Sequence, residues 1–402
     1  MKNSELKKIL TVLILIASAV FIYMAAAGTE KAGKDPGDQA RVNPPETTGL
    51  RPEGEDSAEE VSGPTEGRPQ KRGSRQVLNF IERELVNEDG GIMTGYLPEK
   101  GVPLKNTDVL SESQGLVMEY AVGIRDKALF DKCFNYVNGK MRKDPLIAWV
   151  VTEKGPARVN SSVDDLRIYR VLRKAESIWG GYSQMLDNLE RALRRYNTQD
   201  HRLVNQYDFK YRKKSDKLKL GFADFEALKL LGDSNPLWEQ VCQNSLTTVE
   251  NGYISGSFPV YYSEYDYSGK NYIQGDINMA EGMVTIVHLA KINKLRPETL
   301  KWLRRAIDGD GIFARYKTDG TVSPVGRYES TAIYGLACMA AKYAGDTELA
   351  EKALARMEAM QISRPGQKID GAFGNSDGTG IYSFDQCIGL LAYGTVEGSE
   401  EK

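Results

Sequence analysis

Histidine and cysteine are both scarce in this sequence, which contains two histidines and four cysteines in 402 residues. Zinc sites and thiol nucleophiles draw on these residue types, so metal and cysteine chemistry have few candidates. A glycine-rich phosphate loop and a Cys-x-x-Cys motif are also absent from the sequence. We therefore expect no metal and no cofactor, and carboxylates are the most abundant groups that could carry out a reaction.

An excess of charge of one sign is lacking as well. The chain has 53 Lys and Arg residues against 55 Asp and Glu residues, which gives a net charge of −2. A nucleic-acid-binding protein usually carries a strongly basic surface. The charge balance gives no reason to expect nucleic acid as a partner.

The four cysteines, Cys133, Cys242, Cys338 and Cys387, are widely spaced along the chain. Outside the cell such residues can form disulfides, but cysteine also serves as a small buried hydrophobic side chain. A domain with a large core does not need covalent cross-links. We therefore favour the second role for all four.

The long apolar run of the sequence lies within the first 28 residues. Lys2, Lys7 and Lys8 precede residues 9–27, which carry no charge. This length is close to the roughly 20 residues that span a bilayer, with the lysines on the cytoplasmic side. A cleaved signal peptide is the alternative, because residues 25–28 are small. In both cases we expect the rest of the chain to be exported, either anchored to the cell membrane or secreted.

The composition divides the rest of the chain into three parts. Residues 29–75 are rich in Gly, Pro and Glu and show no apolar period, which predicts a disordered linker. Residues 76–396 contain no second linker of this kind, so we expect one large domain there. Residues 397–402 form a short tail.

Apolar residues recur at helical spacing from residue 76 onward, and the pattern predicts a series of twelve helices. The predicted helices cover residues 76–87, 111–124, 128–141, 164–178, 182–197, 221–232, 236–249, 276–292, 297–307, 329–344, 347–361 and 384–394. Three short connections resemble each other, and each carries an aspartate at or near the start of the next helix: Asp126, Asp233 and Asp346. Short connections imply antiparallel neighbours.

The two helices of each predicted pair differ in character. Residues 115–122, 334–341 and 387–393 are apolar on nearly all sides, which is typical of buried helices, whereas residues 186–196 and 349–360 carry charge on one face. Gly-aromatic segments return the chain after several of the second helices and could form short β-hairpins. The pattern predicts an all-α fold, an (α/α)6 toroid of six helical hairpins in which amphipathic helices surround a ring of buried ones.

In such a toroid every buried helix begins at the same end. Five acidic residues occur at or beside these predicted starts: Glu112, Asp164, Asp276, Glu329 and Asp385. A pair of carboxylic acids suffices for glycoside hydrolysis, one as general acid and one as general base. The acids at this end are therefore the candidate catalytic groups.

Glu112 and Asp276 each have a purely structural alternative. Ser111 and Gln114 around Glu112 fit a capping box, and the helix dipole would lower the pKa of Glu112, which opposes a proton donor. Burial or a nearby carboxylate would have to outweigh the dipole. Asp276 could be the N-cap of its helix, a position that also keeps a carboxylate ionised, as a general base requires.

Other side chains are candidates for sugar binding. Asp164 is one, whereas capping is the expected role of its neighbour Asp165. Trp149, in the segment Pro-Leu-Ile-Ala-Trp-Val-Val, could stack on a sugar ring or belong to the core. We add Tyr272, from a tyrosine-rich segment ahead of Asp276, and Phe222 to the candidates. His288 lies in an apolar helix and is expected to be a core residue.

Several segments resemble glycoside hydrolase family 8. The Ser-Glu-Ser-Gln-Gly motif at residues 111–115 is similar to the S-E-G-x-G block of this family, and residues 125–131 are similar to the block that follows it. Residues 145–149 resemble its loop with a sugar-stacking tryptophan, and residues 163–180 resemble its A-x-D-A-D helix that ends in Trp-Gly. The motif Gly-Asp-Ile-Asn around Asp276 resembles the Y-D-A-x-R block.

The resemblance implies an inverting (α/α)6 glycosidase in which Glu112 is the proton donor and Asp276 is the base. The chain departs from the family pattern at two positions. Ser162 replaces the first aspartate of the A-x-D-A-D motif, and Met279 replaces an arginine three residues after the base. We interpret the paired loss of an acid and a base as a change of sugar specificity.

We therefore expect an inverting, endo-acting hydrolase of a bacterial cell-surface or secreted polysaccharide, because an exported member also resembles hydrolases associated with exopolysaccharide synthesis. Inversion requires the two carboxyl groups to lie about 6.5–9.5 Å apart. We expect the polysaccharide to be the partner and the N-terminal segment to be the only contact with the membrane. We also expect the chain to be a monomer. The alternatives are a catalytically inactive polysaccharide-binding protein and a polysaccharide lyase or unsaturated uronyl hydrolase.

Overall fold

The computed structural model describes residues 72–96 and 107–397, and this part of the chain is mostly helical. It contains twelve α-helices and twelve short β-strands. The predicted anchor or signal segment, residues 1–28, lies outside the described residues. Within the described ranges, no helix has both the length and the hydropathy that are needed to cross a bilayer.

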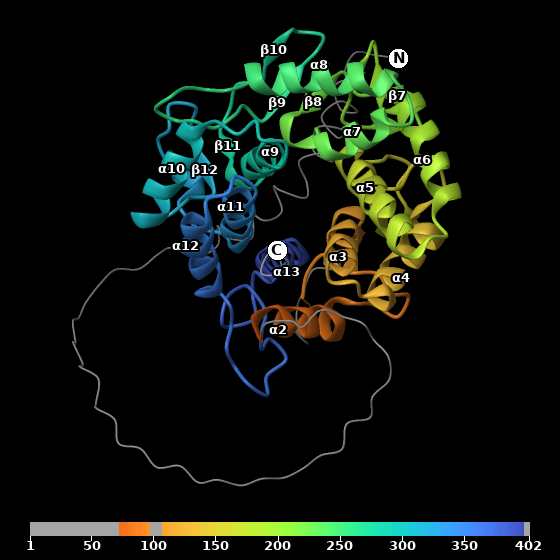
Figure 1. The fold of residues 1–402 in the computed structure, drawn as a ribbon. Helices are drawn as coiled ribbons and strands as arrows, with labels where there is room; N and C mark the ends of the chain where they lie inside the picture. The colour runs from red at the N-terminus through yellow and green to blue at the C-terminus, as the bar shows by residue number, and fades with distance from the viewer. Residues whose placement is uncertain (1–71, 97–106, 398–402) are drawn as a thin grey trace, which may run out of the picture. The chain divides into compact units, whose positions relative to one another are not determined.

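Six helices contact one another in sequence and form the centre of the fold. They are α3 (Ser111–Ile124), α5 (Ser162–Trp179), α7 (Phe225–Gly232), α9 (Met279–Lys291), α11 (Thr331–Tyr343) and α13 (Ser383–Glu397). Each contacts the next, and α13 returns to contact α3, so that the contacts close into a ring (Figure 1). Helix α11 is buried at every position from Thr331 to Ala341, as a helix that is apolar on all sides should be.

Six further helices lie on the outside of these. They are α2 (Arg72–Phe80), α4 (Lys127–Tyr136), α6 (Ser183–Tyr196), α8 (Leu237–Asn251), α10 (Pro297–Asp308) and α12 (Thr347–Glu358). Helix α4 packs on α3, α6 packs on α5, α8 packs on α7, and α12 packs on α11. Helix α2 packs on α13, and α10 packs on α12. The buried positions of α6 are Met185, Leu186, Leu189, Ala192 and Leu193, which form one face of the helix. The predicted alternation of buried and amphipathic helices is confirmed.

The structure places the ends of the helical part slightly outside the expected boundaries. Helix α2 begins at Arg72, four residues before the expected domain start at residue 76. A π-helical turn, Ile81–Leu85, continues it. At the other end α13 reaches Glu397, the first residue of the expected tail.

Aspartate caps start two of the outer helices. Asp126 accepts a hydrogen bond from the Leu129 N–H at 2.9 Å, and Asp346 accepts one from the Leu349 N–H at 3.1 Å. Such side chains satisfy backbone donors that have no partner within the helix. The third aspartate, Asp233, immediately follows α7 instead of capping α8.

Short antiparallel strands connect the helices. One sheet contains β1 (Val109–Leu110), β2 (Val150–Thr152) and β3 (Gly155–Pro156), and a second contains β8 (Lys217–Lys219), β9 (Glu264–Asp266) and β10 (Asn271–Tyr272). Three two-stranded pairs complete the set: β4 (Thr198–Gln199) with β5 (Arg202–Leu203), β6 (Tyr207–Asp208) with β7 (Lys213–Lys214), and β11 (Ile277–Asn278) with β12 (Arg315–Tyr316). These pairings fix the segments that lie before α3, α7 and α9.

The cysteines and one histidine belong to the helix packing. Cys133, Cys338 and Cys387 are buried, Cys242 is partly exposed, and all four are free thiols. His288 in α9 is buried, as predicted, and burial lowers its pKa to about 4. The imidazole is therefore neutral near pH 7.

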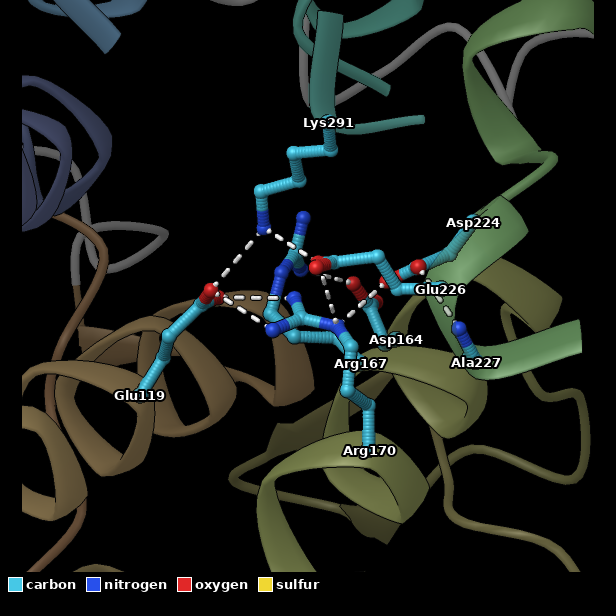
Figure 2. Close-up of polar contacts among 8 residues, drawn as sticks. All are labelled: Glu119, Asp164, Arg167, Arg170, Asp224, Glu226, Ala227 and Lys291. Carbon is cyan, nitrogen blue, oxygen red and sulfur yellow. Dashed lines mark hydrogen bonds and ion pairs between the residues drawn. The ribbon is translucent and has the colours of Figure 1, made fainter. Parts of the chain in front are cut away.

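A buried ionic network connects four of the inner helices (Figure 2). The Arg170 guanidinium in α5 donates two hydrogen bonds to the Glu119 carboxylate in α3, at 2.8 and 3.0 Å. Its Nε donates to Asp224 at the start of α7 at 3.0 Å. Lys291, the last residue of α9, lies 3.3 Å from Glu119 and 2.9 Å from Glu226 of α7. We refer to these five residues as the central ionic network.

The charges of this network depend on one another. Burial alone would raise the pKa of Glu119, but Arg170 and Lys291 outweigh it and hold that pKa well below its usual range. Burial likewise opposes ionisation of Asp224, and Arg170 is the main group that keeps the pKa of Asp224 below its usual range. Loss of the guanidinium would leave two buried carboxylates without their strongest partner.

Candidate active site

Side-chain hydrogen bonds join the first turns of neighbouring inner helices. The Ser111 hydroxyl in α3 donates to Oδ2 of Asp164 in α5 at 2.8 Å. On the other side of α3, the hydroxyl oxygens of Ser113 and Ser383 lie 2.9 Å apart, which joins α3 to α13. The starts of α5, α3 and α13 therefore lie side by side at one end of the ring.

Two more contacts extend this arrangement. The Ala332 N–H in α11 donates to Oδ1 of Asp385 in α13 at 2.9 Å. Lys219, just before α7, lies 2.7 Å from Glu281 in the first turn of α9. We call the side chains gathered at this end the polar rim; they are Glu112, Asp164, Arg167, Lys219, Glu281 and Asp385.

Glu112 lies in the first turn of α3 and is surrounded by four charged side chains of the rim. Burial is the main cause that raises the pKa of Glu112 from 4.5 to about 8, and the Asp164 carboxylate is the next. Glu281 also raises this pKa, whereas Arg167 and Lys219 lower it. Burial and neighbouring carboxylates thus outweigh the helix dipole and raise the pKa of Glu112, which favours its protonated form.

The capping box expected around Glu112 is wrong. The N-cap of α3 is Leu110, which provides no side-chain hydrogen bond. The Ser111 hydroxyl instead donates to Asp164 at 2.8 Å, and its oxygen also lies 3.3 Å from the Trp149 carbonyl oxygen. The Gln114 side chain is buried, and neither of its polar atoms has a hydrogen-bond partner among the described residues. Ser111 therefore positions the neighbouring helix and the Trp149 segment instead of capping α3.

Asp276 is not a helix cap either. Residues 277–278 pair with β12, so α9 begins only at Met279, and Asn278 is its N-cap. The Asp276 side chain is exposed and accepts a hydrogen bond from the Ser323 hydroxyl. Asp276 is therefore open to solvent just ahead of α9, whereas Met279, at the position of the family arginine, is fully buried.

Asp164 and Asp165 have different partners. Asp164 accepts from Nη1 of Arg167 at 2.9 Å and from Ser111. Asp165 does not cap α5; its carboxylate accepts from the Ile147 N–H at 3.0 Å and from the Asn160 amide at 2.6 Å. Burial raises the pKa of Asp165 to about 8. Asp164 faces the polar rim, and Asp165 anchors the segment that carries Trp149.

The structure places the three predicted aromatic residues in two different environments. Trp149 is partly exposed, and its carbonyl accepts from the Ser111 N–H at 3.0 Å, next to Glu112. Phe222 is partly exposed, with its ring centre 5.7 Å from Nζ of Lys219. Tyr272 packs against other tyrosines and donates its hydroxyl to the Thr248 carbonyl in α8 at 2.7 Å. The Trp149 backbone and the Phe222 ring thus lie beside rim residues, whereas the Tyr272 hydroxyl is bound to an outer helix.

Three rim residues were not predicted from the sequence. Arg167 lies one turn after Asp164, a spacing that is typical of helical ion pairs and could have identified it. Glu281 lies in the first turn of α9, where acids are common. Lys219 carried no sequence signal, because its partner is 62 residues away. In the part of the chain that the structure describes, no three His, Cys, Asp or Glu side chains are placed to hold a metal ion.

Comparison with known proteins agrees with the motifs. Residues 102–206 match the family model for glycosyl hydrolases family 8, which covers the segments with Glu112, Trp149 and Asp164. No curated protein sequence matches the chain.

Solved structures give a broader match. An α-amylase from Clostridium perfringens superimposes with a TM-score of 0.74 and 28% identity, covering 81% of this chain and 97% of the other. PssZ from Listeria monocytogenes has a TM-score of 0.63 and 20% identity, covering 84% and 98%. The endo-β-1,4-glucanase CMCax from Acetobacter xylinum has a TM-score of 0.57 and 15% identity, covering 81% and 98%.

These matches confirm the resemblance to glycoside hydrolase family 8, and the chain is a glycosidase. The family model and the α-amylase agree on this class, and the two neighbours of lower identity share the fold.

Proposed function

We propose that the chain is an inverting, endo-acting glycoside hydrolase that cuts a bacterial cell-surface or secreted polysaccharide. Glu112 protonates the oxygen of the leaving sugar. Asp276 takes a proton from a water molecule, which attacks the anomeric carbon from the opposite face. Breaking the glycosidic bond and forming the new C–O bond in this way inverts the anomeric centre.

The observation that carries the proposal is the position of Glu112 in the first turn of α3, where burial and the Asp164 carboxylate raise its pKa. A general acid must hold its proton at the working pH, and a pKa of about 8 meets that requirement. The cause is local, because burial and the Asp164 carboxylate both favour the neutral carboxylic acid.

The position of Asp276 supports the second role. It is exposed, as a group that activates water has to be, and it precedes the helix whose Glu281 acts electrostatically on Glu112. An inverting enzyme needs its two carboxyl groups about 6.5–9.5 Å apart, with room for the water between them. The Ser323 hydroxyl, bonded to Asp276, would orient the carboxylate.

The closed contacts of the six inner helices support an (α/α)6 toroid of six helical hairpins as the full architecture. In that fold the polar rim is the mouth of the ring. The apolar residues 9–27 would tether the enzyme outside the cytoplasmic membrane, or be removed to release it. The polysaccharide is the proposed partner, and we propose that the chain acts as a monomer.

An α-glucan is a second candidate substrate. The α-amylase from Clostridium perfringens has the highest TM-score of the three neighbours described above and is 28% identical to this chain. The β-glucanase neighbour is only 15% identical and supports the shared fold alone. Soluble starch therefore belongs in any substrate test beside β-linked polymers and bacterial exopolysaccharide.

The proposal predicts new reducing ends with inverted configuration. The full-length chain in mild detergent should release reducing ends from at least one polymer among soluble starch, mixed-linkage β-glucan, xylan and exopolysaccharide of its host. Proton NMR of the first products should show the anomer opposite to that of the cleaved bond. Retained configuration would overturn the mechanism, ultraviolet-absorbing unsaturated products would indicate a lyase, and binding without cleavage would indicate an inactive sugar-binding protein.

The pH dependence gives a further prediction. A general acid with a raised pKa should make kcat/KM fall on the basic side near pH 8. Because the Asp164 carboxylate raises the pKa of Glu112, Asp164→Asn should move this basic limb to lower pH. The pH profile of kcat/KM measures the shift. Asp385→Asn is the control, because Asp385 is a rim carboxylate that is not among the main charges acting on Glu112, and it should leave the basic limb of the profile at the native pH. If the basic limb of Asp164→Asn also stays at the native pH, the assignment of this limb to Glu112 is contradicted.

A further inference from the structure

The turn between β6 and β7 carries three exposed cations around an exposed aromatic ring. Residues 207–208 pair with residues 213–214, and the exposed positions of the turn are Lys210, Tyr211, Arg212 and Lys213. The Tyr211 side chain is 53% exposed, and Nζ of Lys210 lies 5.2 Å from its ring centre. Within the described residues, none of the three cations takes part in an ion pair.

Arg195, in the last turn of α6, extends this positive surface. Its guanidinium carbon lies 5.3 Å from the Tyr196 ring centre, and the Tyr196 and Phe209 ring centres lie 5.0 Å apart. Arg195 is exposed and likewise has no ion pair in the described part of the chain. We call Arg195, Lys210, Tyr211, Arg212 and Lys213 the basic patch.

The acidic side chains near the basic patch do not neutralise it. Asp208 of β6 is buried, and its carboxylate accepts from the Lys210 and Tyr211 N–H groups at 2.8 and 2.9 Å. The acids of the adjacent segments have other partners: Asp144 binds Arg158, Asp200 binds Arg202, and Asp216 accepts from the Ser268 hydroxyl. The patch therefore keeps an excess of positive charge on a chain whose net charge is −2.

The base of the hairpin is firmly held. The Phe209 N–H donates to the Arg158 carbonyl at 2.8 Å, and the Phe209 ring packs edge-on against Tyr196 and Tyr207. Nζ of Lys214 donates to the Thr198 carbonyl of β4 at 2.6 Å. The backbone that presents the cations is thus in place before a ligand binds, which reduces the entropy cost of binding.

Backbone pairings connect the basic patch to the polar rim. The Ser111 N–H donates to the Trp149 carbonyl, the Trp149 N–H donates to the Val159 carbonyl, and Val159 pairs with Asp208. Paired segments lie about 4.8 Å apart, so three pairings place the hairpin within about 15 Å of the start of α3. A polymer strand that reaches Glu112 can therefore extend over the basic patch.

The chemistry of the patch matches an acidic polysaccharide. Arginine and lysine bind carboxylates, arginine through two parallel hydrogen bonds. The exposed Tyr211 ring offers a flat surface on which a sugar can stack. A bilayer is a weaker match, because a flat surface that contacts the patch would also approach the neighbouring polar rim and obstruct the polymer there.

We propose that the basic patch binds carboxylate groups of an acidic polysaccharide strand outside the cleavage site. The inference rests on the proposed hydrolase function and narrows its substrate to a polymer that carries acidic groups beyond the cleaved bond. The patch holds the strand and takes no part in the chemical step.

Removal of the positive charge tests the patch. Surface plasmon resonance compares the full-length chain in mild detergent on immobilised carboxymethyl starch and on soluble starch, which has the same backbone without the carboxylates. The native chain should bind the carboxymethylated polymer more tightly, and high salt should remove the difference. The triple variant Lys210→Gln/Arg212→Gln/Lys213→Gln should bind it about 10-fold more weakly, the combined effect of three exposed ion pairs.

A second triple variant is the matched control. Lys294→Gln/Lys301→Gln/Arg305→Gln removes the same charge from exposed positions on and just before α10. It should bind carboxymethyl starch as the native chain does. An equal loss in the two triple variants would show an effect of net charge alone and overturn the inference, as would equal native affinity for the two starches.

Two further outcomes separate this inference from its alternatives. Vesicles of phosphatidylglycerol test the membrane: patch-dependent binding to them that is tighter than binding to carboxymethyl starch would overturn the polysaccharide as partner. If polymers are cut but the first triple variant binds carboxymethyl starch normally, the inference fails and the hydrolase function stands. If no polymer is cut while patch-dependent binding persists, the hydrolase proposal fails and the basic patch is still supported as a polysaccharide-binding surface.

Discussion

Glu112→Gln should reduce kcat on a cleaved polysaccharide by about 10²- to 10⁴-fold, which is the usual contribution of a general acid. The amide cannot donate a proton to the leaving oxygen. It has nearly the same shape as the neutral carboxylic acid that burial and Asp164 maintain, so binding of the polymer and the melting temperature should remain close to native. Initial rates of reducing-end release, together with affinity electrophoresis, measure the two effects separately.

Glu329→Gln is a suitable control for this variant. Glu329 also precedes an inner helix, α11, but its carboxylate contacts the Tyr334 hydroxyl and is not among the charges acting on Glu112. Its replacement should change kcat far less. Equal losses in the two variants would show that any acid at this end is needed for structure alone, and a fully active Glu112→Gln would remove Glu112 from the mechanism.

Arg170→Met should destabilise the fold by about 3–5 kcal/mol, the cost of leaving buried charges without their partner. Arg170 provides two hydrogen bonds to Glu119 and one to Asp224, and all three residues belong to the central ionic network. Methionine fills a similar volume but supplies no donor. Urea unfolding followed by circular dichroism measures the loss, and adding Glu119→Gln to the variant should recover part of it.

An exposed arginine with similar geometry is the matched control. Nη2 of Arg304 lies 2.7 and 2.8 Å from the two oxygens of Asp346, but its side chain is 33% exposed. Because solvent screens such pairs, Arg304→Met should cost no more than about 1 kcal/mol. If Arg170→Met costs as little as the control, the network does not stabilise the ring.

The helices could be predicted from the sequence because their signals are local. Residues 111–124 were predicted as a helix and form α3 with the same ends. The start of α9 was placed at residue 276 but lies at Met279, because residues 277 and 278 pair with Arg315 and Tyr316 instead. A pairing over nearly 40 residues leaves no trace in the helical period, so the alternative role of Asp276 as a helix cap is wrong.

The neighbours of the proposed acid could not be predicted in the same way. The sequence places Glu112 at a helix start, which on its own suggests a lowered pKa. The raised pKa comes from burial and from Asp164, whose position beside α3 depends on how two helices pack. Lys219 and Glu281 likewise come from separate hairpins. The sequence therefore supplies Glu112 and Asp276 as candidate acids, whereas the electrostatic surroundings of Glu112 depend on the packing of the helices.

The two adjacent aspartates of α5 restrict where insertions and deletions can occur in this part of the chain during evolution. Successive helical residues point about 100° apart, so Asp164 contacts Arg167 while Asp165 holds Ile147 and Asn160. One inserted or deleted residue just before them would rotate both side chains by about 100° around the helix axis and break both sets of contacts. Length variation among relatives should therefore avoid residues 157–163.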